Sequence, residues 1–334
     1  ADYYYKKTKD LLLNATLAPS MGFLSAYRNV GSVSNSGLEL TIDTKNIQTK
    51  EFSWTSSFNI SFNRNKVLSL NDDEPSLASR VNWGNFNNAY PYIAIPGHPI
   101  AMFYGHIFDG VYQYTDFDKV GESYILKDGV PNNGNAREKI QPGDIKFKDI
   151  NRDGVVNDYD LTIIGNPNPK HIGGFGNNFQ YKNFDLNVFF QWSYGGDVLN
   201  ANRIEFEGGD PNARTSLNMF ASFANRWTPE NQTNELYRIG GQGPAVYSSR
   251  TIEDGSFLRL KTVSLGYRLP NAWLKKINIK SLRVYASAQN LITWTRYSGP
   301  DPEVSTRPTA LTPSFDWSPY PRPRTLTLGV DISF

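Results

Sequence analysis

The chain has 334 residues, no cysteine and a formal net charge of +2, with 34 basic and 32 acidic residues interspersed along it. The lack of cysteine excludes a disulfide framework and thiolate metal sites, and the even charge balance gives no argument for a nucleic-acid partner. Because no apolar run approaches the length of a membrane helix, a membrane-embedded form of this chain must be a β-barrel.

The amino terminus lacks the charged and apolar regions of a secretory signal. Residues 1–6, ADYYYK, instead have the pattern of the middle of a strand. We therefore expect the chain to be the later part of a longer polypeptide whose export signal lies upstream.

Alternating apolar and polar residues predict two early strands. The first carries Leu38, Leu40 and Ile42 on one face. The second carries a row of larger side chains, namely Phe52, Trp54, Phe58, Ile60 and Phe62. Residues 46–50 lie between the two rows and predict a hairpin.

Four further alternating segments follow. Residues 175–181 and 184–194 are separated only by Lys182 and Asn183, which predicts a tight turn. In 257–269 the apolar phase shifts near Lys261, as at a β-bulge. Residues 282–294 predict the strand that precedes the terminal one.

The last ten residues place every large apolar side chain on one face and small or polar residues on the other. The apolar side chains are Leu326, Leu328, Val330, Ile332 and Phe334. Such a strand fits the closing strand of an outer-membrane barrel, with lipid on one side and a hydrated lumen on the other. An edge strand of a soluble sandwich is the alternative.

Roughly ten strands of the ~10-residue length that crosses a bilayer are predicted, and most other residues fall in connections. Two intervals are long, 70–146 and 197–250, and the second holds a possible helix at 216–226. A soluble sandwich rarely has such connections, whereas outer-membrane barrels combine long loops on one side with short turns on the other.

Several short motifs occur in order along the whole chain. They are DYYYKKTKDLL at 2–12, NVGSVSNSGLEL at 29–40, FYG at 103–105, DGVYQ at 109–113, PGDIKFKD at 142–149, SFLRL at 256–260, QNL at 289–291 and YSGPDPE at 297–303. In this order they resemble the SusC/RagA branch of TonB-dependent outer-membrane transporters.

The resemblance implies an all-β, transmembrane antiparallel barrel of about 22 strands plugged by a separate amino-terminal domain. Residues 1–334 would then be the carboxyl-terminal portion of that barrel with long extracellular loops, the plug and first strands being absent. The resemblance also implies the outer membrane of a Gram-negative bacterium as the location, contact with its lipid, and no enzymatic activity.

As function, the resemblance implies import of oligosaccharides, or of peptides, together with a SusD-like surface lipoprotein and with energy from the TonB complex through the absent amino-terminal region. Two other function classes remain open: a soluble all-β glycan-binding module or adhesin, and a passive porin.

The segment from Asp149 to Asp160 matches the register of an EF-hand calcium loop. Its oxygen donors fall at Asp149, Asn151, Asp153, the Val155 carbonyl, Asn157 and Asp160. Because Asp replaces the usual Glu at the last position, as in the calcium loops of dockerins that it resembles, the choice between Ca²⁺ and Mg²⁺ stays open. We predict a structural cation here; a solvated Asn/Asp-Gly turn is the alternative.

No catalytic or organic-cofactor residue is predicted, since His98, His106 and His171 lie in unrelated segments and no nucleophile elbow, P-loop or dinucleotide fingerprint occurs. Aromatic residues near strand ends predict membrane-interface belts; these are Trp192, Tyr194, Trp294 and Tyr297. Loop aromatics either stack on sugars or pin the loops together; these are Trp83, Phe86, Tyr90, Trp227, Tyr247 and Trp317.

Overall fold

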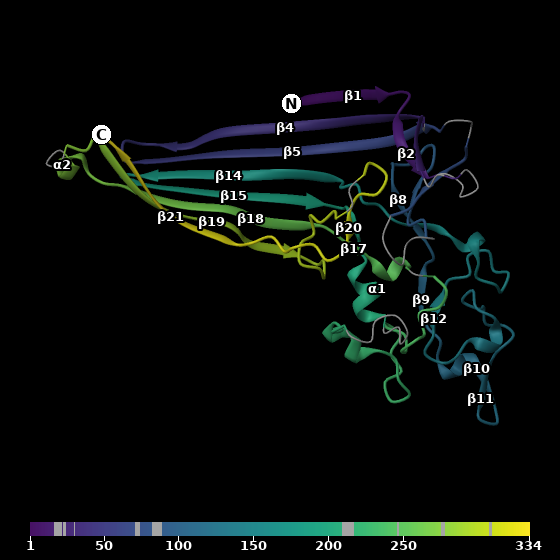
Figure 1. Cartoon of the computed structure of the whole chain (residues 1–334). Helices are drawn as coiled ribbons and strands as arrows, with labels where there is room; N and C mark the ends of the chain where they lie inside the picture. The colour runs from purple at the N-terminus through teal and green to yellow at the C-terminus, as the bar shows by residue number, and fades with distance from the viewer. Residues whose placement is uncertain are drawn as a thin grey trace.

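Eight antiparallel strands form one long sheet, in the order β1-β4-β5-β14-β15-β18-β19-β21 (Figure 1). Their bounds are β1 (Asp2–Thr8), β4 (Ser32–Gln48), β5 (Phe52–Ser69), β14 (His171–Tyr181), β15 (Phe184–Tyr194), β18 (Phe257–Arg268), β19 (Ser281–Thr295) and β21 (Thr325–Ser333). The computed structural model describes all residues except 17–21, 23–24, 30, 71–73, 82–88, 209–216, 246, 275–277 and 307–308. Within the described residues the sheet is open, with β1 and β21 as its edges.

The local features predicted from the alternation are found. β4 and β5 form the expected hairpin. Lys182 takes a φ of 50° in the two-residue turn between β14 and β15, and the pairing of β18 with β19 shifts between Leu260 and Thr262, which confirms the bulge at Lys261. The expected number of spanning strands was too high: eight lie in the sheet, because other apolar runs form short strands in the connections.

One face of the sheet is apolar from strand to strand. Leu186, Leu265, Ala286 and Leu328 follow one another in register across β15, β18, β19 and β21. No described part of the chain covers this face at its edge, where Leu328 is 87% exposed. An uncovered apolar surface spread over a whole sheet is unfavourable in water and favourable against lipid.

The other face is polar at the corresponding level. Asn187, Ser264, Ser287 and Thr327 lie in register on these four strands. The two faces therefore have the chemistry expected for lipid on one side and water on the other.

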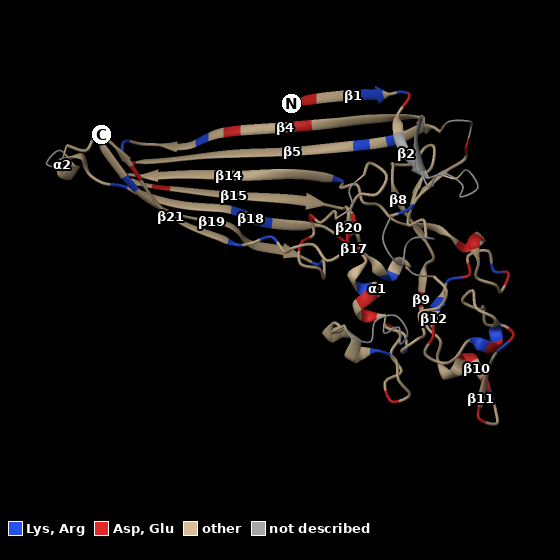
Figure 2. Ribbon diagram, in the orientation of Figure 1, with Lys and Arg blue, Asp and Glu red and all other residues tan. Residues whose placement is uncertain are grey.

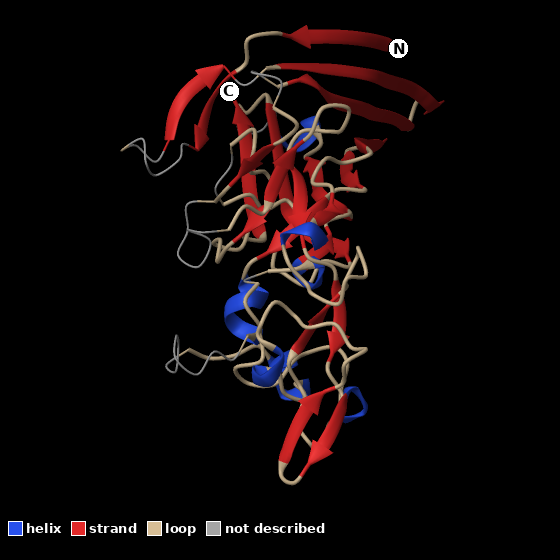
Figure 3. Ribbon diagram, turned by 90° about the vertical axis from the view of Figure 1, so that its right-hand side faces the viewer, coloured by secondary structure: helices blue, strands red, loops and turns tan. Residues whose placement is uncertain are grey.

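The connections at one end of the sheet form a body that we call the cap, which consists of the described residues within 70–170, 195–256 and 296–324 (Figures 1 and 3). It contains four small sheets. Their strands are β6 (Leu77–Ser79), β7 (Tyr92–Ala94), β8 (Met102–Gly105) and β13 (Thr162–Gly165); β9 (Phe108–Val111) and β12 (Ile145–Phe147); β10 (Phe117–Val120) and β11 (Ser123–Leu126); and β16 (Asp197–Asn200), β17 (Ile252–Asp254) and β20 (Phe315–Asp316).

A further hairpin, β2 (Leu12–Thr16) with β3 (Ser25–Asn29), follows β1. The described helices are short: α1 (Asn202–Glu207), α2 (Asn271–Leu274), η4 (Tyr114–Asp116), η5 (Arg137–Lys139), η6 (Asp158–Asp160), η7 (Ala221–Asn225) and η8 (Ser249–Thr251). The helix expected at 216–226 is only the 3-10 turn η7 where it is described, and residue 216 lies outside the described residues. No helix among the described residues is long and apolar enough to cross a membrane.

The buried core lies in the cap rather than against the sheet. Tyr92, Phe103, Leu199 and Phe315 are fully buried in one cluster, and a second cluster surrounds Phe147. Charged residues also gather on the cap and at the strand ends (Figure 2). The cap is therefore built like a water-soluble domain, whereas the sheet is not.

Candidate functional site

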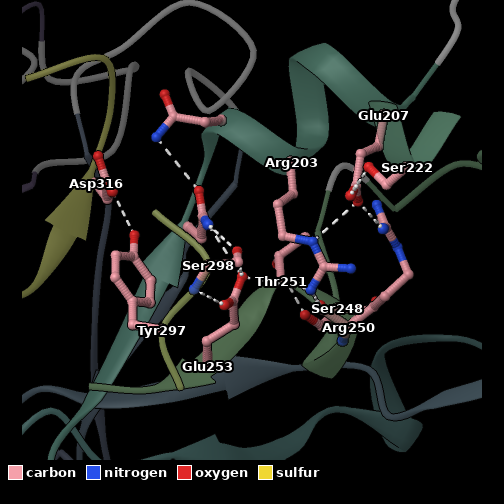
Figure 4. Close-up of polar contacts among 12 residues, drawn as sticks. Arg203, Glu207, Ser222, Ser248, Arg250, Thr251, Glu253, Tyr297, Ser298 and Asp316 are labelled. Atoms are coloured by element: carbon pink, nitrogen blue, oxygen red, sulfur yellow. Dashed lines mark hydrogen bonds and ion pairs between the residues drawn. The ribbon is translucent and has the colours of Figure 1, made fainter. Parts of the chain in front are cut away.

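A buried polar network joins separate segments of the cap at the place where it meets the sheet (Figure 4). Its first centre is Glu207, at the end of α1. The Glu207 carboxylate accepts from Arg203 Nε at 2.9 Å, from Arg250 Nη1 at 2.7 Å and from Ser222 Oγ at 2.7 Å. Burial raises the pKa of Glu207, but these three donors together outweigh burial and hold that pKa below its ordinary value.

The second centre is Glu253 on β17. Its Oε1 accepts from Asn200 Nδ2 at 3.0 Å and from Ser298 Oγ at 2.8 Å, and its Oε2 accepts from the Ser298 backbone N–H at 2.9 Å. Arg203 Nη1 lies 3.4 Å from Glu253 Oε1 and links the two centres. One carboxylate thus fastens β16 and the segment after β19 to β17.

The third centre is the buried pair of Tyr297 and Asp316. The Tyr297 hydroxyl donates to Asp316 Oδ2, and Asp316 is fully buried in β20. The other oxygen, Oδ1, has no hydrogen-bond partner among the described residues. Burial raises the pKa of the Asp316 carboxyl above its ordinary value, and the hydrogen bond from Tyr297 offsets only part of that rise.

A separate charged cluster holds the segment after β19 against β18. Arg259 is 3% exposed and donates to Asp301 Oδ1 and to Glu303 Oε2, both at 2.6 Å. Arg322 binds the same two residues at 2.7 and 2.9 Å but is 44% exposed. Gln191 Nε2 adds a contact of 3.3 Å to Glu303. The motif YSGPDPE is therefore bound at both its tyrosine and its acidic end.

These contacts position the loops and provide no catalytic arrangement. Each carboxylate named is bound to a cation, to a tyrosine or to neutral donors. The region can present ordered loop surfaces at one end of the sheet.

The predicted cation loop is compact and places all six candidate residues around one turn. Asp149 accepts from the backbone N–H groups of Arg152 at 2.6 Å and Gly154 at 2.8 Å. Arg152 and Gly154 have φ values of 64° and 86°, which wind the chain tightly. The glycine suits its position because such a backbone carries little strain there.

The other candidate ligand residues also form hydrogen bonds within the loop. Asn151 Nδ2 donates to Asp153 Oδ2 at 2.9 Å, and Asn157 Nδ2 donates to the Val155 carbonyl at 3.3 Å. Asp160 is fully buried; its Oδ1 accepts from Ile150 N–H at 2.7 Å and its Oδ2 from Asn157 N–H at 2.9 Å.

Two observations bear on whether this loop fits a cation. No group of three or more His, Cys, Asp or Glu side chains converges for a metal within the described part of the chain, so a cation here needs the amide and carbonyl oxygens as well. A carboxylate oxygen that accepts one N–H keeps a second lone pair. Asp149 and Asp153 therefore still have lone pairs with which to bind a cation. The donor set fits a hard, oxygen-binding cation such as Ca²⁺ or Mg²⁺.

Most of the loop aromatics that the structure describes pack within the cap and are not free to stack on a sugar. Trp227 is buried and donates from Nε1 to Gln113 Oε1 at 3.1 Å. Tyr247 donates to the Tyr104 carbonyl at 2.6 Å, and Trp317 packs against the first core cluster. Tyr90 is exposed, while 83 and 86 lie outside the described residues.

The aromatic residues predicted to form membrane-interface belts lie in two different environments. Trp294 and Tyr194 are about half exposed on the apolar face of the sheet. Tyr297, expected in the same belt, is instead buried in the cap through its bond to Asp316. That expectation was wrong because the chain turns inward after β19. The three histidines lie apart: His98 in a turn, His106 against Phe147 and His171 on β14.

Sequence reasoning missed the arginine–carboxylate centres. Arg259 and Asp301 are 42 residues apart, and Arg250 and Glu207 are 43 residues apart, so no local spacing joins them. The available signal was the pair of motifs SFLRL and YSGPDPE. The first contains a basic residue, Arg259, and the second contains two acidic residues, Asp301 and Glu303.

Comparison with known proteins gives consistent matches over the whole chain, although no family model matches it. It is 36% identical to TonB-dependent receptor P3 of Formosa agariphila, covering 100% of this chain and 32% of that protein. It is 30% identical to TonB-dependent receptor SusC of Bacteroides thetaiotaomicron, covering 100% of this chain and 30% of that protein.

A solved structure, described as the structure of the RagAB peptide transporter, matches 99% of this chain and 32% of the matched chain, with a TM-score of 0.75 and 25% identity. The chain spans about a third of the length of the relatives it matches.

Proposed function

Because the chain belongs to the SusC/RagA family of TonB-dependent receptors, we propose that its eight-stranded sheet is the carboxyl-terminal part of a plugged barrel of about 22 strands. Receptors of this family are outer-membrane proteins of Gram-negative bacteria and transporters rather than enzymes. Strands contributed by the rest of the receptor would pair with the open edges β1 and β21, because unpaired strand edges are unfavourable in a bilayer.

The observation that carries this proposal is the two-faced sheet with the cap at one end. The apolar face supplies the lipid contact, and the polar face supplies the wall of a hydrated lumen. The cap lies on the side of the long connections, which in outer-membrane barrels is the extracellular side.

The proposed activity is TonB-dependent import of a solute too large for porins, an oligosaccharide or a peptide, in partnership with a SusD-like surface lipoprotein. The relative from B. thetaiotaomicron is named SusC, and the matched structure is that of a peptide transporter. The name of the matched structure supports the peptide class, and the oligosaccharide class rests on the resemblance to the SusC/RagA branch. TonB would act through the amino-terminal region outside this chain.

The structural role of the buried network supports this activity. A lid protein and a large solute both require a defined surface at the mouth of the barrel, and Glu207, Glu253 and Arg259 fix three loop segments there. Ordered loops bind with a smaller entropic cost than mobile ones.

We also propose one structural divalent cation in the loop from Asp149 to Asp160. It would cross-link a long connection of the cap. Its ligands would be the six residues named above, and its role would be structural.

Uptake by cells tests the proposed activity. Cells with the full-length receptor and its lid protein should accumulate labelled oligosaccharide or peptide, and this accumulation should stop when TonB is deleted. Uptake that persists without TonB would favour a passive porin. A receptor that is recovered without detergent would favour a soluble binding module.

A further inference from the structure

An aromatic ring lies on the polar face of the sheet, over two glycines of the neighbouring strand. Phe189 stands between Val188 and Phe190 of the apolar face in β15, so its side chain is on the polar face. A Cβ at Gly174 of β14 would lie 2.8 Å from Cζ of the Phe189 ring, and one at Gly176 would lie 3.6 Å from Cδ2. The ring therefore covers both glycines, which are buried, while Phe189 itself is only half-buried and stays accessible from the polar side.

Side-chain amides from three strands border this ring. Asn59 of β5 pairs with Gly174, and its Nδ2 lies 3.3 Å from the Cβ position at that glycine. Two residues before Phe189 in β15, Asn187 Nδ2 donates to Asn178 Oδ1 at 2.6 Å. This bond uses one donor and one acceptor of the pair, and each amide has further donor and acceptor sites. The ring is thus bordered by neutral groups that can both donate and accept hydrogen bonds.

The rows of side chains that pass through Phe189 and Asn187 are neutral from β5 to β21. The first row continues through Ser57, Gly176, Thr262, Gln289 and Thr325, and the second through Thr55, Asn178, Ser264, Ser287 and Thr327. Beyond β5 the rows reach Asp43 and Lys45 of β4, which have opposite charges. On the cap side of the rows, the Lys261 ammonium is hydrogen-bonded to a neighbouring glutamine. Along the rows an ionised solute group would therefore exchange water for neutral amides and hydroxyls, which is unfavourable.

A sugar unit matches both kinds of group at this place. Its C–H face can pack on an aromatic ring, and its hydroxyl groups can donate to and accept from side-chain amides. A peptide could also use the amides through its backbone N–H and C=O groups, but its termini carry charges that these rows do not match. The neutrality of the rows therefore favours an uncharged, hydroxyl-rich solute.

We propose that Phe189, with Asn59, Asn178 and Asn187, is a contact site for an uncharged sugar unit of the imported solute. The sugar ring packs on Phe189, and its hydroxyl groups bind the three amides. The proposal rests on the proposed function, which makes the polar face the wall of the lumen, and it selects an oligosaccharide over a peptide as the solute. Gly174 acts as a positioning residue, because only a residue without Cβ lets the ring lie where it does.

Uptake by cells that carry the full-length receptor and its lid protein tests the proposal. The probes are labelled maltohexaose, cellohexaose and mannohexaose, which are neutral, and labelled hexaalanine. The wild type should take up at least one hexasaccharide in a TonB-dependent manner. Phe189→Ala should raise the half-saturating concentration of that sugar about fivefold, which corresponds to the loss of about 1 kcal/mol of aromatic contact. Phe189→Tyr keeps a ring and should stay close to wild type, and so should Phe190→Ala, whose ring is on the apolar face.

The two glycines test the position of the ring without removing it. Gly174→Ala should raise the half-saturating concentration in the same direction as Phe189→Ala, because the new Cβ would displace a ring atom that lies 2.8 Å away. Gly176→Ala is the matched control on the same strand and face, since 3.6 Å is an ordinary contact, and it should behave as wild type. The mobility of unheated receptor on gels shows that each variant is folded.

An unchanged half-saturating concentration in folded Phe189→Ala would overturn the proposal, as would equal effects of the two glycine variants. Uptake of hexaalanine and of no hexasaccharide would also overturn it and would assign the ring to a peptide. Entry of a small dye through Phe189→Ala, with sugar affinity unchanged, would overturn it by showing that the ring packs against the plug. In each of these cases TonB-dependent uptake by the wild type would remain. Failure of the proposed function would instead remove TonB-dependent uptake of every probe.

Discussion

Thr327 and Leu328 are neighbours in β21 and lie on opposite faces of the sheet, where Thr327 pairs with Ser287 and Leu328 with Ala286 on β19. Arginine at Leu328 would enter the lipid and should cost about 2 to 4 kcal/mol near the bilayer midplane. Arginine at Thr327 would face the hydrated side and should cost much less. Urea-dependent folding of the two full-length variants into vesicles measures the difference. Equal tolerance of both substitutions would contradict the assignment of faces.

The two arginines that bind Asp301 and Glu303 should differ in importance because they differ in burial. Arg259→Ala removes the buried cation that pairs with Asp301 and Glu303. It should lower the free energy of unfolding by about 3 kcal/mol. Arg322→Ala removes a half-exposed partner of the same groups and should cost about 1 kcal/mol or less. Denaturation of the receptor and proteolysis within 297–324 report both effects. A larger effect at Arg322 than at Arg259 would show that burial does not set the strength of this cluster.

The cation loop should lose its ion when Asp149 and Asp153 are both replaced by alanine. Elemental analysis of the purified receptor in millimolar Ca²⁺ should find one ion fewer in the variant than in the wild type. A high-resolution map of the wild type should show metal–oxygen distances of about 2.3 to 2.6 Å for Ca²⁺, or of about 2.0 to 2.1 Å for Mg²⁺. The barrel should still assemble, because its stability comes from strand pairing and lipid contact. Asp118→Ala with Glu122→Ala, in the β10–β11 hairpin, is the control and should keep the ion. A high-resolution map in Ca²⁺ with only water among these side chains would refute the site.

The pH dependence of cap stability should have opposite signs at Asp316 and Glu207. The folded pKa of Asp316 is raised by burial, so its contribution is present below the unfolded pKa and is lost as pH rises through the folded pKa. Asp316→Asn should therefore gain stability relative to wild type as pH increases from about 4 to 7.

The folded pKa of Glu207 is lowered by its three donors despite burial, so its contribution is present above the unfolded pKa and is lost as pH falls through the folded pKa. Glu207→Gln should be most destabilising near neutral pH and least destabilising in acid. Melting of the cap, followed by proteolysis across this pH range, separates the two variants. Parallel pH profiles for both would contradict these assignments.

The spanning strands could be predicted from the sequence because one face is apolar along its whole length. That period-two pattern holds for β15 from Phe184 to Tyr194 and for β21, and the proposed contact with lipid requires it at every second residue. The turn at Lys182 and the bulge at Lys261 were predictable for the same reason, since each interrupts a regular alternation.

The cap could not be predicted in the same way. Its strands are short, as in β7 from Tyr92 to Ala94, in which all three residues are buried. Three residues are too few to show a periodic pattern. Its polar centres join residues that are far apart in sequence, as Arg259 and Asp301 are. The cation loop was visible because all its donors are local, and its occupancy stays a prediction.

The placement of the two faces and the two ends of the sheet is tested most directly by cysteine labelling, with the receptor that lacks the introduced cysteine as the control. The positions are Tyr159 in the cap, Trp273 at the opposite end and Leu328 on the apolar face, which are 83%, 63% and 87% exposed. Each would be replaced by cysteine in the full-length receptor and treated with a membrane-impermeant maleimide.

We expect Tyr159→Cys to react on intact cells, Trp273→Cys to react only after the outer membrane is permeabilised, and Leu328→Cys to react in neither case because lipid covers it. Reaction of Leu328→Cys as readily as Tyr159→Cys, or of Trp273→Cys before Tyr159→Cys, would contradict the placement of this sheet in the outer membrane with its cap outside.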